Sequence, residues 1–183
     1  MTEFVPAATL AAALPDVLDA PAAMTTVHML CTRPAYNQRV FPDRISMSRR
    51  HGVEDDCEMQ RPWLKLADGQ PDPRIHVSIL PLRVLDLIWR DRAATVHPGD
   101  TIIADLNTAT ASLPPGSLLR VGSAVLRVSD LWNNGCAKWK VRYGAAAHAW
   151  VSDPAHEGHR LRGILCSVEQ DGETGLGDPI TRL

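Results

Sequence analysis

Short runs of β-forming residues, separated by turn-forming residues, make up most of the chain. The turn signals recur about every 8 to 12 residues, a spacing typical of all-β sandwiches and barrels. The pattern predicts roughly eight to ten short strands. The clearest runs cover residues 25–31, 39–41, 44–48, 74–80, 101–105, 117–121, 124–129 and 161–168.

Two turn signals in the second half of the chain predict hairpins. Gly122-Ser123 separates the runs 117–121 and 124–129, and a two-residue loop with glycine is a common hairpin connection. Asp171-Gly172 follows the run 161–168 and is a second hairpin signal.

Helical spacing is clearest after Pro81, a residue type that suits the first position of a helix. Apolar residues recur there at helical spacing and predict a core-packing helix over 81–92. Its apolar face consists of Leu82, Leu85, Ile88 and Trp89. The Ala-rich stretch 144–151 is a second helical candidate.

The first 26 residues differ from the rest, because they are Ala-rich and acidic. They predict one or two short helical turns, since Pro15 either interrupts a helix or begins a new one. We expect residues 1–26 to form a frayed helical arm on the surface and residues 27–183 to form one domain. Residues 58–73 hold three prolines and a glycine, which predicts a long surface loop.

Together these elements predict a mainly β fold, a closed β-barrel with one or more flanking helices. Short strands would otherwise expose unpaired edges, and closure removes those edges. A structure with parallel strands threaded by helices would contradict this prediction.

Charge and apolar patterning limit the partners. The 183-residue chain has a net charge of −2, so no overall positive field would gather nucleic acid or anionic lipid. Any bound anion therefore needs a local cluster of donors. Residues 1–32 contain no Lys or Arg, and no apolar run approaches the length of a membrane span. We expect a cytoplasmic protein with no membrane and no nucleic-acid partner.

Four cysteines, Cys31, Cys57, Cys136 and Cys166, are too sparse for a disulfide scaffold and form no C-x-x-C pair. We therefore expect reduced thiols. Cys166 lies in an apolar strand and is expected in the core. Cys57 follows an acidic turn that would disfavour its thiolate, and Cys31 gives no signal.

Cys136 has a different setting, because it follows the turn Asn133-Asn134-Gly135 just after a strand. Lys138 and Lys140 come next, and their charge would favour the thiolate, the reactive and metal-binding form. The alternative is a half-buried structural cysteine. The flanking Trp132 and Trp139 are candidates for the wall of a cleft.

Eight short motifs in order resemble those of the MOSC domain family, named for the C-terminal part of molybdenum-cofactor sulfurases. The resemblance covers about residues 27–180, and the N-terminal arm is similar to that of stand-alone bacterial members. The motifs are Gly52-Val-Glu-Asp-Asp56, Arg74-Ile-His-Val-Ser78, Pro98-Gly-Asp100, Asp105-Leu-Asn107, Leu113-Pro-Pro-Gly-Ser-Leu-Leu-Arg-Val-Gly122, Gly135-Cys-Ala-Lys138, Leu161-Arg-Gly-Ile164 and Gly177-Asp-Pro179.

The resemblance implies a barrel with a cleft and one functional cysteine, which maps onto Cys136. In relatives this cysteine ligates the molybdenum of a pterin cofactor (molybdopterin) or is proposed to carry sulfur as a persulfide. A thiolate is a soft ligand suited to such a metal. Some relatives carry an attached pyridoxal-phosphate domain; we expect no such domain and no pyridoxal-phosphate site in these 183 residues.

The matched motifs give six further candidates for cofactor binding, and four of them have a structural alternative. For Arg162 the alternative is an exposed ion pair, and for His76 a satisfied core histidine. Asp56 and Asn107 could instead cap turns. The full candidate set is Asp56, Arg74, His76, Asn107, Lys138 and Arg162.

Two positions depart from the family pattern. Asp55 stands where a glycine is common, and its charge would oppose the close approach of an anionic cofactor. Asp105-Leu-Asn107 replaces a usual Glu-Asn pair.

Three functions follow from this reading. The first is reduction of small N- or S-oxygenated compounds by a bound molybdenum cofactor, with a protein electron donor. The second is a non-catalytic carrier that passes sulfur or cofactor to a partner enzyme. The third is a barrel that has lost the cofactor.

Overall fold

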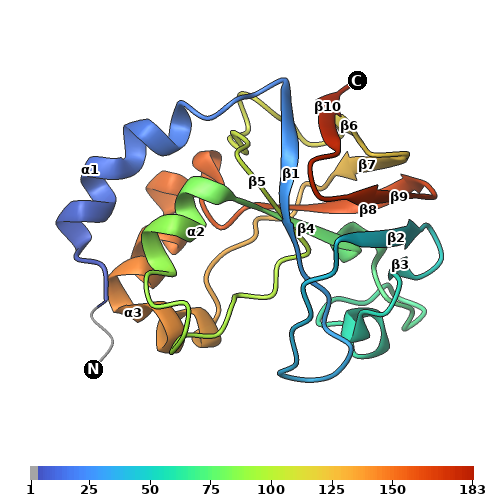
Figure 1. The fold of residues 1–183 in the computed structure, drawn as a ribbon, viewed down its shortest axis with the longest axis horizontal. Helices are drawn as coiled ribbons and strands as arrows, with labels where there is room; N and C mark the ends of the chain where they lie inside the picture. The colour runs from blue at the N-terminus through green and yellow to red at the C-terminus, as the bar shows by residue number, and fades with distance from the viewer. Residues whose placement is uncertain (1–3) are drawn as a thin grey trace.

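The computed structural model describes residues 4–183, and within them seven strands close a barrel (Figure 1). Around the barrel the strand order is β1-β10-β6-β7-β8-β4-β5, and β5 pairs back with β1. The predicted closed barrel with flanking helices is therefore confirmed. The strands are β1 (Met24–Leu30), β4 (Val77–Pro81), β5 (Ile102–Ala104), β6 (Leu118–Val121), β7 (Ala124–Val128), β8 (Ile164–Gln170) and β10 (Pro179–Arg182).

The predicted hairpin at Gly122-Ser123 is confirmed. Strands β6 and β7 pair antiparallel, with Leu118 opposite Arg127 and Val121 opposite Ala124. Gly122 has a φ of 58°, which glycine adopts without steric cost. The turn chemistry and the alternation of the flanking residues thus fix this pairing locally.

The second hairpin signal is wrong, because the strand after Asp171-Gly172 does not pair with β8. Strand β9 (Gly172–Gly175) instead pairs antiparallel with β2 (Arg44–Ser48), and β2 also pairs with β3 (Gly52–Val53). These strands form a separate three-stranded sheet beside the barrel. The predicted strand 39–41 is reduced to a single bridge between Thr32 and Val40.

Strands β4 and β5 form the parallel pair of the barrel, and helix α2 (Leu82–Ile88) lies in the connection between them. The helix is confirmed but ends before the expected Arg92, because Trp89 leaves the helical conformation. The predicted strand 74–80 begins late, at Val77. Its first residues instead form a 3₁₀ turn, Pro73–Ile75, whose backbone is capped by the Asp72 carboxylate.

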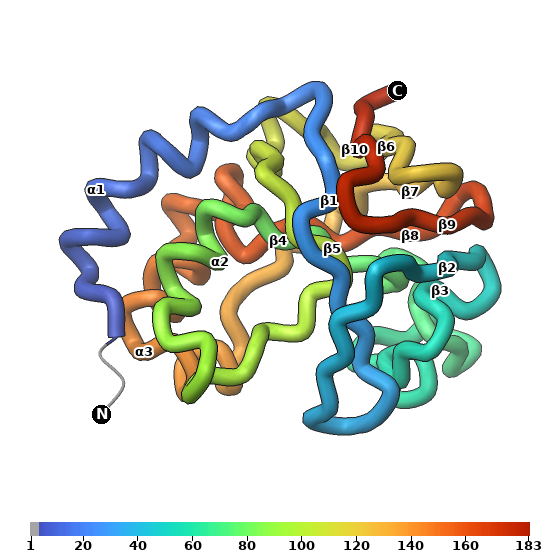
Figure 2. Tube along the Cα trace, in the orientation of Figure 1, coloured from blue at the N-terminus to red at the C-terminus, as the bar shows by residue number. Residues whose placement is uncertain are grey.

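The N-terminal arm is more ordered than expected. It forms one helix, α1 (Ala7–Leu18), with Pro15 inside it, and Leu10 and Val17 are buried. Figure 2 shows α1 running along the outside of α2 and α3 before the chain enters β1, and α1 contacts both helices. The interpretation of a frayed arm is corrected, because the arm contributes Val5, Leu10 and Val17 to a core shared with α2 and α3.

Helix α3 (Ala137–Ser152) is longer than the predicted 144–151. It begins directly after Cys136, in a stretch expected to be a turn. Gly144, at a φ of 92°, interrupts the helical conformation and lets the chain bend. Helix α3 therefore consists of two helical parts that are joined by a kink at Gly144.

Two apolar cores hold these layers together. One fills the barrel and the base of the small sheet, and the other joins the three helices to the outer face of the barrel. The predicted loop 58–73 carries a 3₁₀ turn, Cys57–Gln60, and one bridge, Lys65 to Pro71. A further 3₁₀ segment, Pro154–His159, follows α3. No helix described here has the length and apolar character needed to cross a membrane.

Candidate functional site

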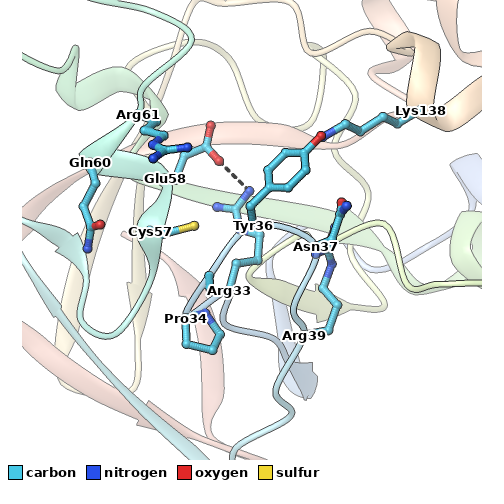
Figure 3. Close-up of a pocket in the computed structure, with 11 residues that line it drawn as sticks. Arg33, Pro34, Tyr36, Asn37, Arg39, Cys57, Glu58, Gln60, Arg61 and Lys138 are labelled. Atoms are coloured by element: carbon cyan, nitrogen blue, oxygen red, sulfur yellow. Dashed lines mark hydrogen bonds and ion pairs between the residues drawn. The ribbon is translucent and has the colours of Figure 1, made fainter.

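A cleft lies where the segment after β1, the turn after Asp56 and the start of α3 meet (Figure 3). Its volume is about 510 Å³, within the range of small-molecule sites. The lining residues are Arg33, Pro34, Ala35, Tyr36, Asn37, Arg39, Cys57, Glu58, Gln60, Arg61 and Lys138.

Positive charge dominates this cleft. Of the described lining side chains, four are cationic, Arg33, Arg39, Arg61 and Lys138, and one, Glu58, is anionic. The protein as a whole has a net charge of −2. The cleft is therefore a local cluster of the kind that an anion requires in this chain.

Arg33 is the most strongly anchored of these cations. Its Nε donates to Asp56 at 3.0 Å and its Nη1 to Glu58 at 2.8 Å. Burial disfavours the charged guanidinium, but the carboxylates of Asp56 and Glu58 outweigh it and raise the pKa of Arg33. The charge of Arg33 is therefore largely compensated by these two carboxylates, and the ion pairs fix the cleft wall.

Arg39 is held differently, by three backbone carbonyls. It donates to the oxygens of Gln38, His97 and Pro98. Burial, followed by the charge of Arg142, lowers the pKa of Arg39. No carboxylate within residues 4–183 forms an ion pair with it, so its positive charge is uncompensated locally.

Lys138 reaches the cleft from the first turn of α3. Its ammonium lies 4.3 Å from the centre of the Tyr36 ring, a cation–π contact. Figure 3 shows the Lys138 side chain extending toward Tyr36. Among the sequence-predicted site residues, Lys138 is the one that lines this cleft.

Cys136 is exposed and is the residue immediately before α3. Its carbonyl accepts from the N–H groups of Trp139 and Lys140. The preceding Gly135 is tied to the far end of the helix, because it donates to Ser152 and its carbonyl contacts His148 Nε2 at 3.0 Å. Cys136 is outside the set of described residues that line the cleft, two positions before Lys138.

Cys57 lines the cleft, and sequence reasoning missed it. The acidic turn before it was expected to disfavour a thiolate. In the structure, Asp56 is nearly fully buried and paired with Arg33, which neutralises its charge. This pair spans 23 positions in the chain, and no local signal in the sequence reveals it.

Asp56 and Asp55 shape the turn below the cleft. The Asp56 carboxylate accepts from Arg33 and from the backbone N–H of Glu58, so it caps the 3₁₀ turn and anchors Arg33. Asp55 has a φ of 61°, in the left-handed region that favours glycine. This conformation gives a physical reason for the glycine that is common at this position in the family the sequence resembles.

Arg74 and His76 lie apart from the lining residues. Arg74 donates hydrogen bonds to the carboxylates of Asp72 and Asp130, and these bonds, that to Asp72 first, raise the pKa of Arg74. It forms ion pairs with both. His76 is buried next to Gly52, and its Nδ1 has no hydrogen-bond partner in the described chain. Burial lowers the pKa of His76, so this ring favours its neutral form.

Arg162 and Asn107 have structural partners. Arg162 donates to the buried carboxylate of Asp100 at 2.6 Å and stacks 4.4 Å from the centre of the Trp139 ring. The Asn107 side chain bonds to Leu18 and Ala109, which fastens the helical arm to the barrel. Trp139 is buried among the helices, so the expectation that it walls the cleft is corrected.

The comparisons with known proteins agree on the fold. No family model and no curated protein sequence matches the chain. The crystal structure of the YuaD protein from Bacillus subtilis is similar, with a TM-score of 0.60 and 19% identity over 86% of this chain and 94% of that one. The crystal structure of YiiM from Escherichia coli has a TM-score of 0.57 and 16% identity over 87% of this chain and 69% of that one.

Fold and site together define a class of protein: a mixed β-barrel flanked by helices, with a cation-lined cleft and an exposed thiol at the start of a cleft-lining helix. The comparison with YuaD and YiiM concerns the fold alone, which the chain shares with both.

Proposed function

We propose that the chain is a MOSC-domain protein that binds a molybdenum cofactor, with Cys136 as the metal ligand. The observation that carries the proposal is the joint placement of Cys136 and Lys138. Helix α3 presents an exposed thiol at its start and sends its second residue into a cation-lined cleft of about 510 Å³. The ordered motifs and the shared barrel fold support the same family.

The residues present fit the chemistry of such a cofactor. Its phosphate needs cationic donors, and Arg39, Arg61 and Lys138 supply them. Three of the five N–H groups of Arg39 donate to backbone carbonyls, which leaves two for a ligand. A thiolate is a soft donor suited to a metal that is also bound by dithiolene sulfur. Within residues 4–183 no three His, Cys, Asp or Glu side chains gather as a metal site, and the proposal asks for one protein ligand.

When bound, the cofactor would supply two-electron redox chemistry for the reduction of small N- or S-oxygenated compounds. The chain's own residues would hold and orient the cofactor. Arg33, fixed by Asp56 and Glu58, stiffens the cleft wall, and Lys138 meets the anionic end of the ligand. The buried Asp100–Arg162 ion pair supports the first turn of α3, because the Arg162 guanidinium stacks on the Trp139 ring.

A second candidate function is a carrier that passes sulfur or cofactor to a partner enzyme and turns nothing over. The exposure of Cys136 favours it, because an exposed thiol is accessible to the site of another protein.

Two measurements on protein expressed in a cofactor-competent host test these functions. Elemental analysis should find molybdenum with the purified protein; protein without molybdenum or bound pterin would indicate a barrel that has lost the cofactor. Reduction of N-hydroxylated bases with a supplied electron donor then separates the two candidates. An enzyme turns over many times, whereas a carrier shows no turnover but activates an apo-enzyme partner.

A further inference from the structure

A pair of histidines lies on the 3₁₀ segment Pro154–His159 that follows α3, outside the set of residues that line the cleft. The pair is His156 and His159, which are three positions apart in the chain. A 3₁₀ helix has three residues per turn, so side chains at i and i+3 project from the same side. The two imidazole rings are accordingly close, with their centres 5.7 Å apart and their planes at 37°.

The backbone fixes the tautomer of His156. Its Nδ1 lies 2.8 Å from the carbonyl oxygen of Trp150, and a carbonyl oxygen can only accept, so Nδ1 carries the ring hydrogen. In the neutral ring, Nε2 therefore holds the lone pair. A histidine that binds a metal almost always donates its other ring N–H to a carbonyl, a carboxylate or water in this way. His156 is thus oriented to act as a ligand through Nε2.

The nitrogen atoms that would bind an ion are open to solvent. Both histidines are partly exposed. Within residues 4–183 no hydrogen bond uses His156 Nε2 or either ring nitrogen of His159, and none of these three atoms is among the buried polar atoms without a partner. An atom that is neither bonded nor buried is reached by water, and a dissolved ion can reach it as well.

The separation of the rings suits one shared metal ion. An ion bound to an imidazole nitrogen at about 2.0–2.1 Å lies about 3.2 Å from the centre of that ring. Two imidazoles that bind one ion at an angle of about 100–130° then have ring centres about 5–6 Å apart. The observed distance between the centres of His156 and His159, 5.7 Å, lies in this range.

The segment that carries the pair is anchored at both ends. At its start, the Asp153 carboxylate accepts from the backbone N–H of Ala155 at 2.9 Å. Near its end, the Gly158 carbonyl accepts from the backbone N–H of Thr110 at 2.8 Å, and the N–H of Arg160 bonds back to carbonyls of the segment. Two ligands on an anchored segment lose little conformational freedom when they bind an ion.

The charge around the pair favours a cation. Asp153 and Glu157 belong to the same stretch, and residues 153–159 contain no Lys or Arg. The next residue, Arg160, is buried and donates to Thr110 and to the carbonyl of Leu113. Its positive charge is therefore turned into the protein.

We propose that His156 and His159 together bind one divalent transition-metal ion of the kind that imidazole prefers, such as Ni²⁺, Cu²⁺ or Zn²⁺. His156 binds through Nε2, and His159 binds through a ring nitrogen that solvent reaches. No group of three or more His, Cys, Asp or Glu gathers as a metal site in the described chain, so water completes the coordination. The pair shares no residue with the proposed cofactor site and is tested independently of it.

The competing explanation is aromatic packing alone. The ring centres of Trp150 and His156 are 6.4 Å apart at 79°, so Trp150 and the two histidines could form a packed cluster of three rings. The two explanations differ in what the rings discriminate. A metal site prefers a transition-metal ion to a hard cation and needs both histidines, whereas a packed cluster shows neither property.

Titration of the tag-free protein with Ni²⁺, followed by calorimetry and by the ring signals in histidine NMR spectra, tests the proposal. The chain has seven histidines. We expect the paramagnetic ion to broaden the signals of His156 and His159 saturably and at the lowest concentrations. Mg²⁺, which prefers oxygen ligands, should leave them unchanged. The ring signals also separate this site from Ni²⁺ bound at the accessible thiols, Cys57 and Cys136.

Two variants each remove one ligand. His156→Asn keeps a donor for the Trp150 carbonyl and removes Nε2, and His159→Gln removes the second ring. Loss of one of two linked ligands should weaken Ni²⁺ binding at this site by at least about tenfold. His51→Gln is the matched control, because His51 is exposed in the turn between β2 and β3; its affinity should equal that of the unsubstituted protein.

Three results would each overturn the proposal. They are the absence of saturable broadening at His156 and His159, an equal response to Mg²⁺, and a Ni²⁺ affinity that either His156→Asn or His159→Gln leaves unchanged. None of these measurements depends on the molybdenum content of the protein, so failure here and failure of the proposed function are distinguishable.

Discussion

Burial divides the four cysteines into two chemical groups. Cys31 and Cys166 are fully buried, and burial raises the pKa of each thiol to about 12. Cys57 is half-buried in the cleft, and Cys136 is exposed at the start of α3. The sequence placed Cys166 in the core correctly, because an apolar strand surrounds it. The environment of Cys57 depended on the distant Arg33 and was not predicted.

Substitution of the core thiol should affect stability alone. Cys166→Ser places a hydroxyl in the apolar barrel core and should lower the free energy of unfolding by about 1–3 kcal/mol. Cys136→Ser, at an exposed position, should change it by less than about 0.5 kcal/mol. Urea denaturation of both variants measures this; equal losses would show that Cys136 also packs in the core.

Asp55 offers a test of charge beside the cleft. Asp55→Asn keeps a residue type that tolerates positive φ and removes the negative charge. We expect unchanged thermal stability and equal or greater cofactor retention, since repulsion of an anionic ligand is relieved. The measurement is the pterin-to-protein ratio after purification, and a lower ratio would mean that the carboxylate contributes to binding.

At the scale of elements, locally encoded features were predictable and long-range ones were not. The β6–β7 hairpin and the start of α2 follow from turn residues and helical spacing nearby. The pairing of β9 with β2 was not predictable, because β2 lies more than a hundred residues earlier in the chain. The start of α3 was missed because Asn133-Asn134-Gly135 reads locally as a turn, while Ser152 and His148 hold it as the entry to a helix.

The first turn of α3 contains a matched pair of lysines for testing the cleft. Lys138→Met removes a cleft cation, whereas Lys140→Met removes the same charge from an exposed position outside the described lining. We expect Lys138→Met to weaken cofactor retention by about tenfold, the value of one charge-assisted contact. Lys140→Met should retain as much as the unsubstituted protein. Equal losses would point to general electrostatics and not to the cleft.

For the whole molecule, two apolar cores and a closed barrel leave few buried side-chain polar atoms without a partner among the described residues: His76 Nδ1, His97 Nε2, Asp100 Oδ2, Trp150 Nε1 and Thr174 Oγ1. His97 is the clearest case, since its folded pKa of about 4 lies below the ordinary 6.5. Burial is the main cause; the nearby Asp100 opposes it, and Arg39, Arg162 and Arg92 add to it. The barrel class itself was predicted from strand number and turn spacing, because closure depends on global pattern more than on any one residue.

This shift predicts a pH dependence of stability. Above pH 6.5 the ring is neutral in both the folded and unfolded states, and the full stability is present. As pH falls from about 6.5 to 4, the His97 ring binds a proton in the unfolded state but stays neutral in the folded state. The free energy of unfolding therefore falls by up to about 3 kcal/mol. In His97→Asn this loss should shrink to the remainder set by His76, whose pKa is also lowered. Urea denaturation at pH 7 and pH 5 measures the loss of unfolding free energy in both proteins. An equal loss in His97→Asn and the unsubstituted protein would contradict the assignment of this pH dependence to His97.

The molybdenum content of Cys136→Ser tests the central claim most directly. The control is Cys57→Ser, which removes the cleft thiol and leaves the start of α3 intact. Both variants and the unsubstituted protein are expressed in a cofactor-competent host and measured by elemental analysis per mole of folded protein. Cys136 as the metal ligand predicts that Cys136→Ser loses molybdenum while Cys57→Ser retains it. Retention by Cys136→Ser at the level of the unsubstituted protein would contradict the account.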